Sequence, residues 1–83
     1  MSHKAYETGI LYMKLEEYKS ALITFVQVTD LYYDTDYIDL THLKIIECHF
    51  QKGEIDKARA HYDLKRKNIE NIKMDDLVYE WFI

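Results

Sequence analysis

The chain has 83 residues, of which 48% are hydrophobic and 31% charged, so it can form one small packed domain but not two catalytic domains. Its formal charge of −4 makes nucleic acid or an anionic membrane surface an unexpected partner. Proline is absent and only two glycines occur, which argues against turn-rich β-sandwiches and barrels. We therefore expect an all-α fold.

Two helices are predicted in the first part of the chain. The first begins at Ala5 and the second spans residues 18–32, with the segment Lys14–Glu17 between them as a solvated turn. Both show the i, i+3, i+4, i+7 spacing of one buried face. The buried residues of the first are Ala5, Tyr6, Gly9, Ile10, Tyr12 and Met13, and those of the second are Tyr18, Ala21, Leu22, Phe25, Val26, Val28, Leu31 and Tyr32.

The polar string at residues 34–36 is expected to be a linker to the next two helices. Asp36 followed by Asp39 is typical of an N-cap with an acid in the first turn, so a third helix should begin near Tyr37. Residues 51–54 break that helix, and Gly53 suits a positive φ just past its C-terminus. The third helix carries Leu40, Leu43, Ile45, Ile46, Cys48, His49 and Phe50.

A fourth helix follows at once, and a short closing helix is expected near the end of the chain. The fourth buries Ile55, Ala58, Tyr62 and Ile69, and carries Lys65-Arg66-Lys67 in its last turns. Residues 68–73 are ambiguous between a helix end and a loop. Asp75 is expected to cap the closing helix over about 75–83, which is strongly apolar.

The first pair of predicted helices aligns with the second pair at a fixed offset of 37 residues, the distance from Ala5 to His42. At this offset Gly9 aligns with Ile46, Tyr12 with His49, Tyr18 with Ile55, Ala21 with Ala58 and Phe25 with Tyr62. Two antiparallel helices need small side chains where their backbones approach, and glycine and alanine meet that need. The chain is therefore predicted to contain two copies of one helical hairpin.

This spacing resembles the tetratricopeptide repeat, in which the first helix carries Gly and then Tyr and the second carries Ala followed four residues later by Phe or Tyr. Copy one matches all four positions, whereas Ile46 and His49 replace the Gly and Tyr in copy two. The resemblance implies an α-solenoid in one domain, 1–83, with repeats at about 2–35 and 36–72 and a capping helix at about 75–83. The alternative is an ordinary four- or five-helix bundle.

The junction between the copies, residues 31–37, has a finer resemblance. It is similar to the repeat junctions of BamD-type outer-membrane assembly lipoproteins and Tol-Pal-associated periplasmic proteins, with Tyr33 in place of their proline. This resemblance implies a periplasmic scaffold that is a fragment of a longer chain. If the chain is not related to these lipoproteins, a cytoplasmic protein is expected. No apolar stretch approaches ~20 residues and no signal-peptide core follows Met1, so we expect a soluble chain without direct membrane insertion.

No catalytic residue, metal or cofactor is predicted. The alternative of a transition-metal site at His42, Cys48 and His49 is disfavoured, because no further ligand follows at helical spacing and these positions suit core packing. His61 is expected on the solvent face. Asp34 and the acids near it lack the glycine and terminal glutamate of a calcium loop. Phosphate-binding and nucleophile motifs are also missing, so we do not expect an enzyme.

Function is expected at the surface. In solenoids of this type the first helix of each pair lines a concave groove that binds a protein or peptide. The groove residues that the resemblance implies are His3, Tyr6, Ile10, Met13 and Lys14 in copy one, and Leu40, Leu43, Glu47, Phe50 and Gln51 in copy two. This set is mostly apolar, so an apolar helix or extended segment is the expected ligand.

An alternative assigns the apolar surfaces to self-association. Solenoids usually need three or more repeats with polar caps, whereas this chain carries two repeats and an apolar end. In that case Trp81, Phe82 and Ile83 form the contact of a homodimer. The groove residues themselves can also pack on a further repeat or on another copy of the chain.

Overall fold

The computed structural model describes residues 2–31 and 37–83, and in these residues every regular element is a helix. The prediction of an all-α fold is confirmed. The helices are α1 (Ser2–Lys14), α2 (Tyr18–Leu31), α3 (Tyr37–Gln51), α4 (Ile55–Leu64), α5 (Arg66–Asn71) and α6 (Asp75–Glu80).

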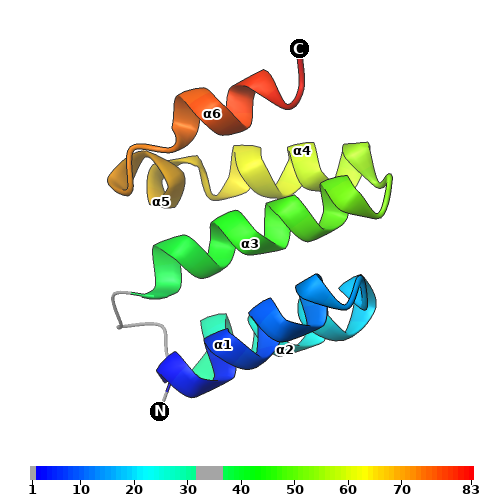
Figure 1. Cartoon of the computed structure of the whole chain (residues 1–83). Coiled ribbons are helices and arrows are strands. Elements are labelled where there is room, and N and C mark those ends of the chain that lie inside the picture. The colour runs from blue at the N-terminus through cyan, green and yellow to red at the C-terminus, as the bar shows by residue number, and fades with distance from the viewer. Residues whose placement is uncertain (1, 32–36) are drawn as a thin grey trace.

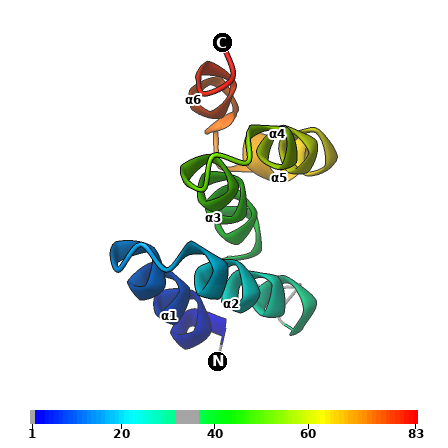
Figure 2. The ribbon, with the colours of Figure 1, turned by 90° about the vertical axis from the view of Figure 1, so that its right-hand side faces the viewer.

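The helices pack in the order of the chain, with neighbours running antiparallel (Figure 1). The α1–α2 hairpin lies at one end of the stack, α3 crosses the middle, and α6 lies at the other end. Figure 2 shows α4 and α5 together on one side of α3, and α5 contacts α3 as well as α4. Helix α3 is thus the central element, because it contacts α1, α2, α4 and α5.

A first core cluster joins α1, α2 and α3. It is built around Phe25, whose side chain is fully buried, together with Tyr6, Ala21, Ile45 and Cys48. Gly9 lies where α1 and α2 approach, because a Cβ at this position would be 2.5 Å from a ring carbon of Phe25. The small residue predicted for a close helix contact is therefore required by the packing.

A second core cluster joins α3 to the C-terminal helices. Its buried members are Leu43, Ile46, Ala58, Tyr62, Ile69 and Val78. The partly buried rings of Phe50, Trp81 and Phe82 pack against this cluster. Because Leu40 contacts both clusters, α3 carries apolar side chains toward both ends of the stack.

The turns after α1, α3 and α5 share one geometry, and Lys73 holds the positive φ, 58°, in the turn after α5. Gly53 has a φ of 81°, as predicted, and Glu16 adopts a φ of 59° in the turn after α1. In each turn this residue's N–H bonds to the carbonyl three residues before it, and the next N–H bonds to the carbonyl five residues before it. These are the two hydrogen bonds of a Schellman motif, which satisfies the last carbonyl groups of a helix.

The structure corrects several predicted boundaries. Helix α1 begins before Ala5, and the fourth helix is interrupted at Lys65, so α4 and α5 are separate. Asp75 does not cap the closing helix: it is the first residue of α6, Met74 precedes it, and no side chain caps that end. Ile55 is 42% exposed and Val26 is 45% exposed rather than buried. The expected N-cap Asp36 and most of the repeat junction lie outside the described residues.

Candidate functional site

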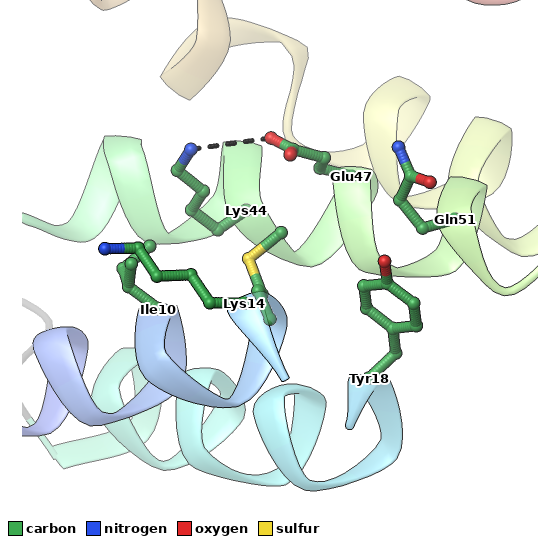
Figure 3. A pocket seen from close by; sticks show the side chains of 7 residues that line it. Ile10, Lys14, Tyr18, Lys44, Glu47 and Gln51 are labelled. Carbon is green, nitrogen blue, oxygen red and sulfur yellow. Dashed lines mark hydrogen bonds and ion pairs between the residues drawn. The ribbon is translucent and has the colours of Figure 1, made fainter. Parts of the chain in front are cut away.

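A hollow of about 340 Å³ lies between α1 and α3 (Figure 3). A second hollow of about 520 Å³ adjoins it along α1, and the two share Ile10, Lys14 and Lys44. We call the two together the α1–α3 groove. The other residues that line the first hollow are Met13, Tyr18, Glu47 and Gln51, and those that line the second are Tyr6, Glu7 and Leu11.

Helical periodicity places these side chains on facing surfaces. Ile10 and Lys14 are one helical turn apart on α1, and Lys44, Glu47 and Gln51 follow the i, i+3, i+7 spacing along one stripe of α3. Figure 3 shows Ile10 and Tyr18 pointing toward α3, and Lys44 and Glu47 turned toward each other along α3. The groove therefore has an apolar floor and a rim that carries both charges.

The rim charges are available to a partner. Lys44 Nζ lies 3.4 Å from Glu47 Oε1, and both side chains are partly exposed, so this ion pair contributes little to stability. Lys14 is exposed and makes no ion pair with any residue that the structure describes. A ligand with a polar group beside an apolar anchor can engage either lysine without breaking a buried interaction.

Tyr6 has a structural role at the end of the groove. Its ring packs on Phe25, with centroids 5.8 Å apart, and on Tyr37 at 5.2 Å. Burial raises the pKa of Tyr6 to about 12, so the hydroxyl is neutral at physiological pH. Tyr6 therefore contributes an uncharged wall rather than a titrating group.

The structure brings together most of the predicted groove residues. Five of them line the first hollow, namely Ile10, Met13, Lys14, Glu47 and Gln51, and Tyr6 lines the second. Leu43 and Leu40 instead pack in the core, and Phe50 packs against Trp81 and Phe82. The side chain of His3 lies outside the described part of the chain.

Sequence reasoning missed four residues of the groove, which are Glu7, Leu11, Tyr18 and Lys44. A signal for Lys44 was present, because it lies three residues before Glu47 and so on the same stripe of the helix. Tyr18 is the first residue of α2, and nothing in a one-helix pattern predicts that it reaches across to α3.

The three residues of the candidate oligomer contact at the C-terminus differ in their surroundings: two pack on other rings of the chain and one is exposed. Trp81 and Phe82 pack on the ring of Phe50 with centroids 5.7 Å and 6.2 Å away, and Phe82 also lies 5.9 Å from the ring of Tyr62. Ile83 is 88% exposed. Most of the apolar surface of Trp81 and Phe82 therefore faces the chain itself.

Two histidines form a contact that the sequence pattern did not predict. His42 Nδ1 on α3 lies 3.1 Å from His61 Nε2 on α4. Burial lowers the pKa of both imidazoles, that of His61 to about 4, so both rings are neutral at pH 7. The prediction that His61 lies on the solvent face is wrong, because the antiparallel α3–α4 hairpin brings it against His42.

The other candidate metal ligands are separated from this pair. His49 Nδ1 donates a hydrogen bond to Glu54 Oε1 at 2.9 Å. Cys48 is fully buried, and burial raises the pKa of its thiol to about 12, so it packs as a small apolar group. In residues 2–31 and 37–83, no group of three or more His, Cys, Asp or Glu side chains could hold a metal ion.

Comparison with protein-family models, curated proteins and solved structures found no match for this chain. Among the described residues, no helix is long and apolar enough to cross a membrane. The α1–α3 groove and the histidine pair are thus the two features from which a function can be inferred.

Proposed function

We propose that the chain is a tetratricopeptide-type interaction module, without catalytic activity, that binds a partner protein in the α1–α3 groove. The observation that carries this proposal is the origin of the groove: its two walls are the first helices of two hairpins whose sequences align at an offset of 37 residues. Tetratricopeptide arrays bind peptides on the surface formed by these helices.

The turn geometry supports the assignment of two repeats. Glu16 and Gly53 are 37 residues apart and both adopt positive φ. Glu16 N–H bonds to Met13 O at 3.0 Å and Gly53 N–H to Phe50 O at 3.0 Å; the following N–H groups bond to Tyr12 O and His49 O at 2.8 and 2.9 Å. The same capping motif thus recurs at the repeat offset, and it also follows α5 at Lys73, outside that offset.

The packing positions repeat as well. Ala21 and Ala58 are both fully buried, and the aromatic residue four positions later, Phe25 or Tyr62, is buried in each copy. Small residues at a helix contact followed by a large ring are what two stacked hairpins need. The copies differ at Gly9, which aligns with the buried Ile46.

The groove favours a partner with apolar anchors. Ile10 and Met13 supply the apolar floor, and the charged rim residues Lys14, Lys44 and Glu47 orient the ligand. Each well-buried anchor contributes about 1.5–3 kcal/mol before the cost of ordering the ligand is subtracted. An amphipathic helix or an extended apolar segment of another protein is therefore the proposed ligand.

A peptide-selection experiment tests this function. Random peptides displayed on phage are selected against the whole chain, and the affinity of the selected peptides is measured by fluorescence anisotropy. Ile10→Ser and Met13→Ser should each weaken binding by about tenfold or more, which corresponds to one lost apolar anchor. Leu64→Ser is the matched control, because Leu64 is 74% exposed on α4 and outside the groove. Equal binding by all four proteins would refute groove binding.

The resemblance of residues 31–37 to lipoprotein repeat junctions leads us to propose the periplasm as the compartment of this chain. A role as a periplasmic scaffold in outer-membrane assembly follows if the chain belongs to a BamD-type lipoprotein, although residues 32–36 of the junction lie outside the described structure. The reading frame upstream of Met1 tests this directly. A lipoprotein signal there supports an envelope scaffold, whereas a cytoplasmic location of the whole protein contradicts it.

Self-association is a second candidate function, favoured by the exposed apolar residues of the C-terminal end. Leu77 is 43% exposed, Tyr79 53% and Ile83 88%. A homodimer that buries them would leave the groove free. Light scattering over a concentration series tests it, since a mass that stays monomeric throughout excludes the dimer.

A further inference from the structure

The contact between His42 and His61 lies outside the α1–α3 groove and is independent of the proposed function. The rings come from different helices, with centroids 5.2 Å apart and an angle of 37° between their planes. The α3–α4 hairpin that carries them is fixed by buried packing around Ile46, Ala58 and Tyr62. Two imidazole nitrogens are thus held close together by a rigid part of the core.

We propose that His42 Nδ1 and His61 Nε2 bind one divalent transition-metal ion of the zinc type, which bridges α3 and α4. Zinc binds imidazole nitrogen at 2.0–2.1 Å, so two nitrogen ligands at a tetrahedral centre lie about 3.3 Å apart. The two nitrogens are 3.1 Å apart in the structure. A tetrahedral ion lies off the line between the two nitrogens, so each ring must turn by roughly 35° from its hydrogen-bonded orientation to direct its lone pair to the ion.

Metal binding at this pair requires no net release of protons. In the neutral pair one ring nitrogen donates its N–H to the lone pair of the other. When the ion binds, the donating ring moves that proton to its other nitrogen, so that both facing nitrogens present lone pairs. Each imidazole remains neutral, and the ion replaces the shared proton as the link between the rings.

The surroundings give solvent access to the ion. His42 and His61 open on a hollow of about 420 Å³, where water can complete the coordination sphere. Asp30 of α2 and Lys65 after α4 line the same hollow, and the charge of Lys65 acts on both rings. Asp39, the other acid near His42, accepts a hydrogen bond from Asn68 at 2.7 Å. With two protein ligands the ion is expected to exchange readily.

Zinc titration of the whole chain tests the proposal. The ring nitrogens of the histidines are followed by NMR as zinc chloride is added to metal-free protein at pH 7. The resonances of His42 and His61 should move together and saturate at one ion per chain, while those of His49 stay in place because its Nδ1 is bonded to Glu54. The melting temperature should rise with zinc concentration, since the unfolded chain lacks the paired site.

Two variants separate this site from other zinc binding. His61→Ala should weaken zinc binding by about tenfold or more, because one of two ligands is lost, and His49→Ala should change it less than about twofold. Both are made in a His3→Ala background and checked for helical content by circular dichroism. The proposal fails if zinc leaves the His42 and His61 resonances of the parent chain unmoved, or if His61→Ala binds zinc as tightly as His49→Ala does.

Discussion

Gly9 lies so close to the ring of Phe25 that a Cβ at residue 9 would be 2.5 Å from Cε1 and 2.7 Å from Cζ of that ring. Phe25 is fully buried in a close-packed core, so its ring can move away only by displacing neighbouring side chains. The distance between α1 and α2 therefore depends on the missing side chain at Gly9. The groove depends on it too, because α1 forms one of its walls.

We predict that Gly9→Ala destabilises the fold. Alanine gains about 1 kcal/mol of helix propensity, but overpacking a core contact typically costs about 1–3 kcal/mol and the contact here is severe. A net loss of up to about 2 kcal/mol is expected in urea unfolding. Phe25→Leu in the Gly9→Ala background should remove part of the clash, so that the two changes are non-additive. Additive losses would contradict the packing argument.

The Schellman turns at Glu16 and Gly53 both predict that glycine is favoured at the residue with positive φ, as it would be at Lys73 in the turn after α5. Gly53 has a φ of 81° and nothing within 4 Å of an added Cβ, so Gly53→Ala should destabilise by about 1 kcal/mol through backbone strain alone. Glu16 has a φ of 59°, which is strained for a residue with a side chain, so Glu16→Gly should stabilise the fold. The gain should be about 0.5 kcal/mol once the larger entropy of the unfolded glycine variant is subtracted. Thermal unfolding of both variants checks the pair, and a loss of stability in Glu16→Gly would contradict it.

Much of the fold was predictable because it depends on local periodicity. The apolar spacing located the helices and Gly53 marked a turn, and the structure confirms both. The interruption at Lys65 was not predictable, since no glycine or proline marks it. There the chain turns so that Ile69 and Ile72 pack on α3 and α6, and this long-range packing overrides a continuous helical pattern.

The candidate site was predictable only in part, for a similar reason. Groove residues on the stripes of α1 and α3 follow from helical spacing and an assumed hairpin stack. Phe50 shares the pattern but packs on Trp81, because α6 returns to cover that end of α3. The contact between His42 and His61 depends on the register of two antiparallel helices, which a single-helix pattern does not contain.

The Glu54 carboxylate predicts a dependence of stability on pH. A hydrogen bond from His49, with further attraction from Lys52 and Lys57, lowers the pKa of Glu54 from 4.5 to about 2. Because the pKa is lower in the folded state, this group stabilises the fold above about pH 4.5, and the contribution is lost as the pH falls toward 2.

Glu54→Gln tests that contribution. Its free energy of unfolding at pH 7 should be lower than that of the parent chain, and the difference should shrink between pH 4.5 and 2. The control is Glu80→Gln, because Glu80 is exposed at the end of α6. A difference between Glu54→Gln and the parent that stays constant over this range would contradict the assignment.

Phe50→Ala should release the C-terminal end rather than impair the groove. The Phe50 ring packs on Trp81 and Phe82 and does not line either hollow. Loss of a half-buried ring should cost about 2 kcal/mol, below the range for a fully buried one. Trp81 is the only tryptophan, so its fluorescence reports the change, and a red shift of its emission is expected. Unchanged emission with impaired peptide binding would place Phe50 in the ligand site instead.

The most direct test of the central claim, that the α1–α3 groove binds a partner, is methyl NMR of the chain titrated with a peptide from the phage selection. The methyl groups of Ile10 and Met13 should shift and saturate together, while those of the exposed Leu64 stay in place. Shifts confined to Leu77 and Ile83, with Ile10 and Met13 unperturbed, would contradict groove binding and place the contact on the C-terminal surface.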